Sequence, residues 1–285
     1  MCHKKNILTR MMGLSLLASL GFVAILSLSQ TDTALAATAP TLGAVGSYSV
    51  LAGSILTNTG PTTMPGNLGV SPGIGVPPHV TGFPPGIVGP PGAIHDADAN
   101  AASAQADNTA AFGVLDQPCN IPAYQFGSGV VDLSGANLVP GVYCADAFTL
   151  TGTLTLSGSG VWIFKSASTL ITSGTANVVG GDPCNVWWRV VSSATLGTNT
   201  SLIGNILALT SITLDTGASL NGRALAQTGA VTMDSNTISG QTCIAPGPTV
   251  TTSVPTLDEW GVIIFMVLAG LGSVYYLRKQ KRAIS

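Results

Sequence analysis

Short segments in which small polar residues alternate with aliphatic residues recur through the middle of the chain. Thr, Ser, Ala and Gly alternate with Leu, Ile, Val and Met in units at 152–156, 166–170, 192–196, 210–214 and 229–233. Successive side chains of a strand point to opposite faces of a sheet, so this alternation separates an aliphatic face from a small polar face. The units therefore predict strands with an apolar inner side and an outer side of Thr, Ser and Ala.

Turn residues follow these units and give the pattern a repeat. Examples are Asp215-Thr216-Gly217 and Asp234-Ser235-Asn236, whose residue types tolerate the backbone angles of a sharp corner. A second apolar step then precedes the next Gly, as in 219–222. Several strands per repeat around one continuous interior are typical of a β-helix. We therefore predict a mainly β fold, an irregular right- or left-handed β-helix with coils of unequal length.

One segment, from about 94 to 116, breaks the β pattern. It is rich in Ala, and Ala101, Ala104 and Leu115 lie near helical spacing on a weak apolar stripe. Asp96 and Asp98 near its start suit the positive end of a helix dipole. The segment therefore predicts one long helix that lies along a flank of the β-helix.

The N-terminus has the order of features found in a secretory signal peptide. Three basic residues precede an apolar run at 11–28, and Ala34-Leu35-Ala36 then gives the pattern that a signal peptidase accepts. An uncleaved anchor is the alternative, but the run is near the lower limit of the ~17–25 residues that span a bilayer. We therefore predict a signal peptide at 1–36 and a mature domain at 37–245.

The C-terminus carries a second apolar segment. Residues 260–277 are apolar and long enough to span a membrane, and a basic cluster at 278–282 follows at once. Such a cluster stays on the cytoplasmic side. We therefore predict a Pro/Thr linker at 246–253 and a transmembrane segment at 260–277.

Without its two ends the chain has very little charge. The basic residues that remain are Lys165, Arg189 and Arg223, together with nine Asp and no Glu. Nucleic acids are bound chiefly through cations that neutralise phosphates. Three dispersed cations in an acidic domain argue against nucleic acid as a partner.

Four cysteines remain after removal of the signal peptide, and export would place them in an oxidising compartment. Two disulfides are therefore expected. Four cysteines allow three connectivities, of which we favour Cys119–Cys144, closing a local loop, with Cys184–Cys243, tying the repeat region to its end. A zinc site is the competing interpretation, but no Cys-x-x-Cys or nearby His supports it.

A β-helix can also be a polysaccharide lyase or hydrolase, which needs clustered carboxylates and sometimes Ca²⁺. The Asp residues here are dispersed, and Asp215 and Asp234 occupy positions that Asx-turn bonding explains. His79 and His95 have no Ser or Cys nucleophile in a recognisable setting, and Arg223 suits backbone carbonyls at a corner. We predict that the protein is not an enzyme and uses no metal and no cofactor.

Several segments spread over the mature domain form a recognisable set. They are residues 49–54, 57–61, 66–73, 81–86, the helix with 96–97 and 104–107, and residues 184–188, 204–208 and 221–226. Together they resemble the ice-binding-like β-solenoids of cold-adapted bacteria, algae and fungi. The resemblance implies a β-helix of triangular section, a long helix packed beside it, and an N-terminal strand that joins the solenoid out of sequence order.

The resemblance also implies adsorption to an ice crystal through one flat face, which inhibits ice growth or recrystallisation. Ice-binding members often repeat a Thr-Ala/Gly-x-Thr/Asn pattern, and only 210–213 has Thr at both ends here, which argues against strong antifreeze activity. Lys165 is the one charge expected at the edge of this face. The residues expected to contact ice are Thr153, Thr155, Thr169, Thr195, Thr210, Ser211, Thr213, Ala230 and Thr232.

A Thr ladder is also ordinary sheet chemistry, because β-branched residues suit strands. A cell-surface adhesin or an extracellular matrix protein with the same fold is therefore the alternative function.

The octapeptide ahead of the C-terminal apolar segment is a second recognisable motif. It consists of Val254, Pro255, Thr256, Leu257, Asp258, Glu259, Trp260 and Gly261. It resembles the IPTL-CTERM sorting signal of Gram-negative bacteria, with an ordinary single-span anchor as the alternative. The resemblance implies a tail at 254–285 that an exosortase-type peptidase processes, and a protein of the cell envelope or one secreted after processing.

Overall fold

The computed structural model describes residues 36–119, 129–240 and 243, and near the C-terminus residues 264, 267–273, 275, 276, 278, 279 and 282. They belong to two compact units, Met1–Cys243 and Ile244–Ser285. The predicted signal peptide lies outside the described residues except for Ala36, and so do the predicted linker and the sorting octapeptide. Among the described residues, no helix combines the length and the apolar character needed to cross a membrane.

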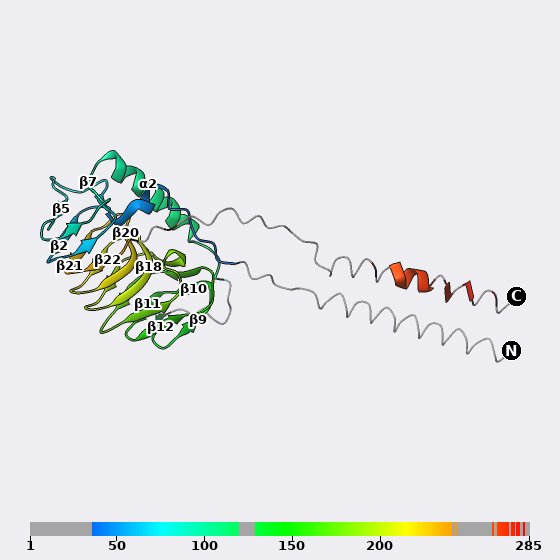
Figure 1. Cartoon of the computed structure of the whole chain (residues 1–285). Coiled ribbons are helices and arrows are strands. Elements are labelled where there is room, and N and C mark those ends of the chain that lie inside the picture. The colour runs from blue at the N-terminus through cyan, green and yellow to red at the C-terminus, as the bar shows by residue number, and fades with distance from the viewer. Residues whose placement is uncertain are drawn as a thin grey trace. The chain divides into compact units, whose positions relative to one another are not determined.

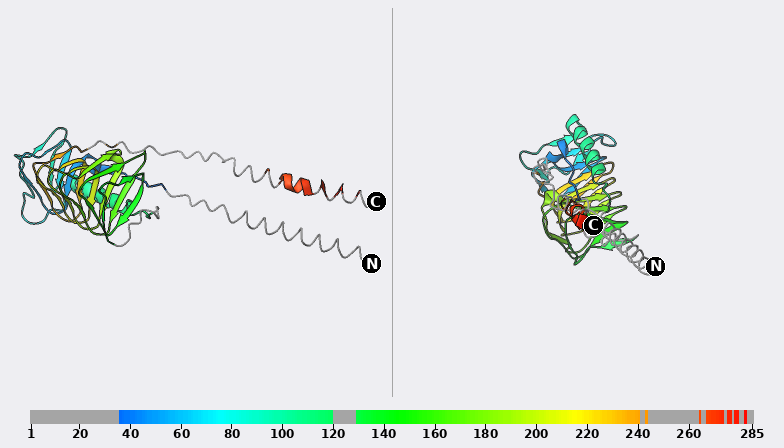
Figure 2. Two further views of the ribbon diagram at one scale, coloured as in Figure 1. Left: turned by 90° about the horizontal axis from the view of Figure 1, so that it is seen from below. Right: turned by 90° about the vertical axis from the view of Figure 1, so that its right-hand side faces the viewer.

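The first unit is a β-helix in which parallel strands stack coil upon coil (Figures 1 and 2). Within the described residues, the strands form one sheet of eight strands and one of fourteen. We call the smaller sheet the eight-stranded face. Its spatial order is β5 (Val80–Thr81), β2 (Leu56–Thr59), β21 (Val231–Asp234), β19 (Ile212–Leu214), β17 (Ala194–Leu196), β14 (Leu170–Thr172), β11 (Ala147–Leu150) and β8 (Val130–Asp132).

The larger sheet bends into two faces, so the mainly β solenoid that the sequence predicted is confirmed. The helix-covered face runs through β10 (Gly141–Ala145), β13 (Trp162–Ser166), β16 (Val186–Val190), β18 (Ser201–Ala208), β20 (Ser219–Ala226), β1 (Tyr48–Ala52), β4 (Asn67–Val70) and β7 (Ile94–Asp96). The third face runs through β9 (Asn137–Leu138), β12 (Thr153–Leu156), β15 (Asn177–Gly180), the first parts of β18 and β20, β22 (Thr237–Ile238), β3 (Thr63–Met64) and β6 (Ile87–Val88).

Glycines make the corner between these two faces possible. Strands β18 and β20 are eight residues long, and Gly204 pairs with Gly222 in the middle of them. Both have positive φ, and a Cβ on Gly222 would lie 1.9 Å from the carbonyl oxygen of Gly204. No other residue fits there, so two neighbouring coils turn the same corner at the same position.

The N-terminal strands join the solenoid out of sequence order, as the resemblance implied. Strand β1 pairs with β20 on one side and with β4 on the other, while β2 pairs with β21 and β5. The buried Arg223 fastens this junction: its guanidinium donates to the carbonyl of Gly46 at 2.8 Å and to Oδ1 of Asn205 at 2.9 Å. Gly46 belongs to the short 3-10 helix η1 (Gly43–Ser47) that leads into β1.

Inward side chains of all three faces fill one continuous apolar core. Aromatic rings occupy the end of it that the β10, β13 and β16 coils enclose. The ring of Phe164 stacks on Trp188 with centroids 4.2 Å apart and on Tyr143 at 5.2 Å, and Phe148 meets its edge at 5.8 Å. Aromatic pairs at these separations add to the energy of burial alone.

The helix α2 (Ala99–Val114) starts five residues later than predicted. Ile94–Asp96 is strand β7, which pairs with β4 through Leu68 and Ile94, so its backbone groups are satisfied by the sheet. Asp98 is the N-cap, and its carboxylate accepts the backbone N–H of Ala101 at 2.8 Å.

The buried side of α2 covers the outward aliphatic and aromatic side chains of the helix-covered face. Ala101, Ala104, Asn108 and Ala111 are buried on the helix, and Leu115 follows them. Ala104, Ala111 and Leu115 pack with residues of η1 and of the sheet into a second apolar cluster, which includes Tyr48, Leu51, Val142, Ile163, Trp187, Leu207 and Leu225. Small Ala side chains allow the helix to approach the sheet closely.

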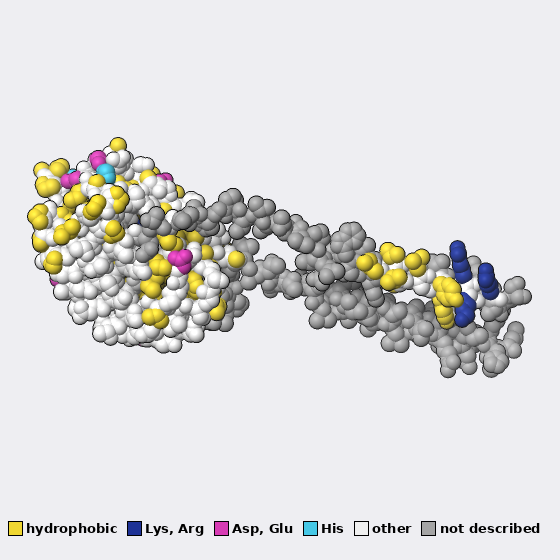
Figure 3. Space-filling model, viewed as in Figure 1, with side chains coloured by type: hydrophobic (Ala, Val, Ile, Leu, Met, Phe, Trp, Pro, Cys, Tyr) yellow, Lys and Arg dark blue, Asp and Glu magenta, His cyan; other side chains and the backbone are white. Residues whose placement is uncertain are grey.

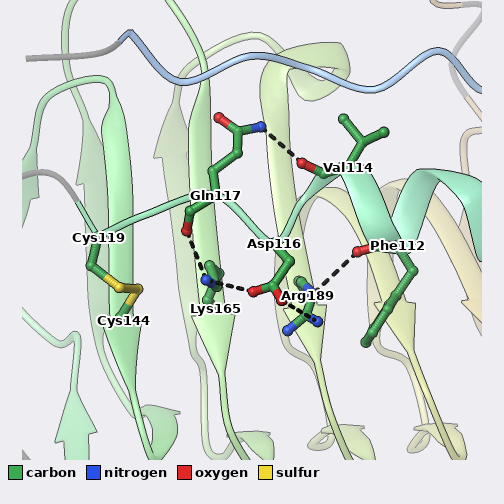
Figure 4. Close-up of polar contacts among 8 residues, drawn as sticks. All are labelled: Phe112, Val114, Asp116, Gln117, Cys119, Cys144, Lys165 and Arg189. Carbon is green, nitrogen blue, oxygen red and sulfur yellow. Dashed lines mark hydrogen bonds and ion pairs between the residues drawn. A yellow bond between two sulfur atoms is a disulfide. The ribbon is translucent and has the colours of Figure 1, made fainter.

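Polar contacts and a disulfide fasten the C-terminal end of α2 (Figure 4). Asp116 lies between Nζ of Lys165, at 2.7 Å, and the guanidinium of Arg189, at 3.5 Å. The hydrogen bond from Lys165 holds the pKa of the Asp116 carboxyl below its usual range, and the positive charges of Arg189 and Lys165 lower it further. Arg189 also covers the ring of Phe112 at 4.2 Å and donates to its carbonyl.

Both favoured disulfides are present. Cys119 is bonded to Cys144 of β10, and Cys184 in the short helix η3 (Pro183–Asn185) is bonded to Cys243. The first ties the segment after α2 to the solenoid, and the second ties the end of the described domain to the corner before β16.

Candidate functional site

A ladder of Thr side chains runs along the middle of the eight-stranded face. Thr195, Thr213 and Thr232 occupy the same register position in β17, β19 and β21. Thr57 of β2 and Thr81 of β5 continue the row beyond Thr232. In the other direction the row passes through Ile171, Thr149 and Asp132.

The sheet geometry makes this row straight and evenly spaced. Neighbouring strands lie ~4.8 Å apart, and outward residues along one strand repeat at roughly 6.6 Å. The residues on either side of Thr195, Thr213 and Thr232 point inward and are buried, as Ile212 and Leu214 are beside Thr213. The Thr side chains themselves are partly or fully exposed, so the backbone fixes their positions while their outer atoms meet solvent.

Long hydrogen bonds join several hydroxyls of the ladder to the protein: Thr81 Oγ1 donates to the carbonyl of Leu56 and Thr149 Oγ1 to that of Val131, both at 3.4 Å. Thr57 Oγ1 donates to Thr232 Oγ1 at 3.4 Å, across the join between the N-terminal and C-terminal coils. Among the described residues, the hydroxyls of Thr195 and Thr213 have no hydrogen-bond partner. They are therefore available to water.

A second row flanks the ladder two positions earlier on each strand, with small residues from β14 to β21 and with Ile55 and His79 before β2 and β5. Thr169, Ser193, Ser211 and Ala230 occupy it, as the backbone hydrogen bonds between neighbouring coils show: Leu170 N–H donates to Ser193, and Ala194 N–H to Ser211. Ile212 N–H donates to Ala230 in the same way. Three predicted site residues, Thr169, Ser211 and Ala230, thus lie in this flanking row beside Thr195, Thr213 and Thr232, while Thr210 is exposed at the turn before β19.

Two predicted site residues lie elsewhere. Thr153 and Thr155 belong to β12 on the third face, where Thr153 pairs with Asn177. The expectation that all the Thr-containing units share one flat face is therefore wrong for this unit. The reason is that outward small and inward aliphatic residues alternate on every side of the solenoid, so the pattern does not specify the side.

Charges near the ladder are confined to its margins. Asp132 ends the row, and Asp215 and Asp234 lie side by side in the file two positions later on each strand, where Asp234 pairs with Thr59. Lys165 was expected at the edge of this face and is not there, because it lies on β13 of the helix-covered face and binds Asp116. In the view of Figure 3 the described part of the solenoid is mostly uncharged, with hydrophobic patches, few Asp and no Lys or Arg.

The sequence prediction missed Thr57, Thr81 and Thr149. Part of the signal was available for Thr57, because Leu56-Thr57 repeats the order of an inward aliphatic residue and an outward Thr, although Ile55 stands where the other units have a small residue. It was missed because the N-terminal strands enter the solenoid next to the last coil rather than the first, and chain order does not show this.

The described histidines are paired with Asp. His79 Nδ1 lies 2.8 Å from Asp96 Oδ1, and His95 Nδ1 lies 2.7 Å from Asp98 Oδ2. Within the described ranges, no group of three or more His, Cys, Asp or Glu residues could hold a metal ion.

Known ice-binding proteins are similar in sequence to this chain over most of its length. An ice-binding protein of Nostoc sp. (strain HG1) is 45% identical over 226 residues, which make up 76% of this chain and 80% of that protein. An ice-binding protein of Colwellia sp. is 31% identical over 214 residues, which cover 70% of this chain and 83% of that protein.

Solved structures agree with these relatives. An ice-binding protein from an Antarctic biological consortium superposes with a TM-score of 0.63 at 39% identity, covering 71% of this chain and 91% of that chain. An ice-binding protein from the Antarctic ascomycete Antarctomyces psychrotrophicus superposes with a TM-score of 0.65 at 38% identity, covering 72% of this chain and 99% of that chain.

Two family models match parts of the chain that do not overlap. The ice-binding-like model matches residues 50–239, and the IPTL-CTERM model matches residues 252–278. The chain therefore belongs to the ice-binding-like family and carries an IPTL-CTERM motif at its C-terminus.

Proposed function

We propose that this protein binds ice through the eight-stranded face, with the Thr ladder and the flanking row of small residues as the contact surface. The observation that carries the proposal is the register of Thr195, Thr213, Thr232, Thr57 and Thr81, which occupy one position in five consecutive strands. The family supports ice as the ligand, and the printed names of the relatives and structural neighbours are those of ice-binding proteins.

The ladder suits ice because it repeats in two directions. A surface with repeats of ~4.8 Å and roughly 6.6 Å presents hydroxyls and methyls on a fixed grid, and such a grid can order water into a layer that merges with a crystal. Thr is β-branched and has few rotamers, so little side-chain freedom is lost on binding. Charged groups would hold water in competing arrangements, and the described Asp132, Asp215 and Asp234 lie at the end of the ladder or along one side of it.

An ice recrystallisation assay tests the proposal directly. The purified protein should keep small ice crystals from coarsening near the melting point, and it should shape single crystals on a cold stage. A folded protein that does neither would contradict ice binding, whichever face is considered.

We propose further that the domain is exported and held in the cell envelope by its C-terminal tail until a sorting peptidase releases it. The IPTL-CTERM match and the order of octapeptide, apolar segment and basic cluster support this. Deleting residues 254–285 should release folded domain from the membrane fraction. Full-length protein that is as soluble as the truncated form would contradict retention by the tail.

A further inference from the structure

One rung of the ladder has no hydroxyl. Ile171 of β14 takes the place that Thr occupies in the strands on both sides, because it pairs with Thr149 of β11 and with Thr195 of β17. Its side chain is 44% exposed, so it is an outward residue and not part of the core. It divides the row into five contiguous Thr rungs on one side and the single rung Thr149, next to Asp132, on the other.

Ile differs from Thr at this position in two ways. Both branches of its Cβ are carbon, so the rung offers no hydrogen bond to an ordered layer of water. One branch is also a carbon longer, so at this rung the side chain rises above the level of its Thr neighbours. Single exposed apolar residues are common and need no functional reason. Ile171, however, lies between Thr149 and Thr195 and interrupts a row of Thr side chains.

We infer that Ile171 sets the limit of the ice-contacting surface, which begins at Thr195 and extends toward Thr81. This inference rests on the proposed function of the eight-stranded face. It predicts that Ile171→Thr would join Thr149 to the other rungs and lengthen the contiguous ladder from five Thr to seven. A larger grid holds a larger ordered layer of water, so the variant should bind ice more strongly than the natural protein.

The substitution should spare the fold. The side chain is exposed, Thr suits a strand as well as Ile does, and exposed substitutions change stability by about 0.5 kcal/mol or less. Ile171→Val is the matched control, because it removes the extra carbon and keeps the β-branch but adds no hydroxyl.

The experiment compares the full chain with Ile171→Thr, Ile171→Val and Thr213→Tyr in a recrystallisation assay, with thermal unfolding of each. We expect Ile171→Thr to act at a several-fold lower concentration than the natural protein, Ile171→Val to change activity less, and Thr213→Tyr to lose activity. Unchanged or weaker activity of a folded Ile171→Thr variant, or an equal gain from Ile171→Val, would overturn the inference. If Thr213→Tyr alone loses activity, the proposed face stands and only the limit at Ile171 is wrong. If Thr213→Tyr retains full activity, the proposed face itself is wrong.

Discussion

Thr57 and Thr232 lie side by side in the eight-stranded face, and their hydroxyl oxygens are 3.4 Å apart although 175 positions separate them in the chain. The contact surface is therefore built from both ends of the domain. Thr57 and Thr81 reach the ladder only because β1 inserts between β20 and β4. The contacts that hold the N-terminal segment on the solenoid, such as that of Arg223 with Gly46, therefore also complete the Thr ladder.

The corner at Gly222 gives the first prediction. Gly222→Ala should destabilise the domain by about 1–3 kcal/mol or more, because its Cβ would meet the carbonyl oxygen of Gly204 at 1.9 Å in a tightly packed coil. Gly113→Ala is the control. Nothing lies within 4 Å of a Cβ there, and Ala should stabilise an exposed helix position by about 0.5–1 kcal/mol. Thermal denaturation of both variants checks this, and a Gly222→Ala variant as stable as the natural protein would contradict the geometry of the corner.

The second prediction concerns the cap of α2 and its pH dependence. The pKa of Asp98 is lowered, first by the backbone N–H of Ala101 and then by the side chain of His95. A carboxyl whose folded pKa is below its unfolded pKa stabilises the protein above the unfolded value, and this contribution is lost as pH falls through the folded pKa. Asp98→Ala should cost about 0.5–2 kcal/mol near neutral pH.

Asp98→Asn separates the cap from the charge. Asn is also a good N-cap, so this variant should keep most of the stability near neutral pH and lose less stability than the natural protein on acidification. Unfolding curves measured between neutral and acid pH give both values. A natural protein whose stability falls no more steeply with acid than that of Asp98→Asn would show that the carboxylate does not contribute.

The third prediction concerns the disulfides. Thiol titration of the denatured, unreduced mature protein should find no free thiol. Disulfides typically stabilise by about 2–4 kcal/mol, and by more for longer loops. The Cys184–Cys243 bond spans 59 positions and the Cys119–Cys144 bond spans 25. Replacing Cys184 and Cys243 with Ser should therefore lower the melting temperature more than replacing Cys119 and Cys144 with Ser. The opposite order would contradict the loop-entropy argument for this domain.

Local patterns in the sequence predicted the elements well. The units at 152–156, 192–196, 210–214 and 229–233 overlap β12, β17, β19 and β21, because alternation of Thr with aliphatic residues reflects burial of one side of a strand. The predicted strand at 166–170 is wrong, since residues 167–169 form the bend between β13 and β14. The start of α2 was predicted less well. Ile94 fits a helical stripe, but its pairing with Leu68 places it in a strand, and only Asp98 marks the cap.

The arrangement of the elements was harder to predict than the elements themselves. Thr155 and Thr195 stand in units of the same pattern, yet one lies on the third face and the other on the eight-stranded face. Each coil of a three-sided solenoid repeats the pattern on each side, so the side is fixed by the corners and by stacking between coils. Those contacts join residues far apart in the chain, as Thr57 and Thr232 are.

The most direct test of the central claim compares the two faces. Thr213→Tyr with Thr232→Tyr places two rings on adjacent rungs of the eight-stranded face, and Thr63→Tyr with Thr237→Tyr does the same on the third face. All four positions face solvent at least in part, so each double variant should stay folded. Ice recrystallisation inhibition should collapse in the first variant and persist in the second. Loss of inhibition in the Thr63 and Thr237 variant, with full activity in the Thr213 and Thr232 variant, would contradict the assignment of ice contact to the eight-stranded face.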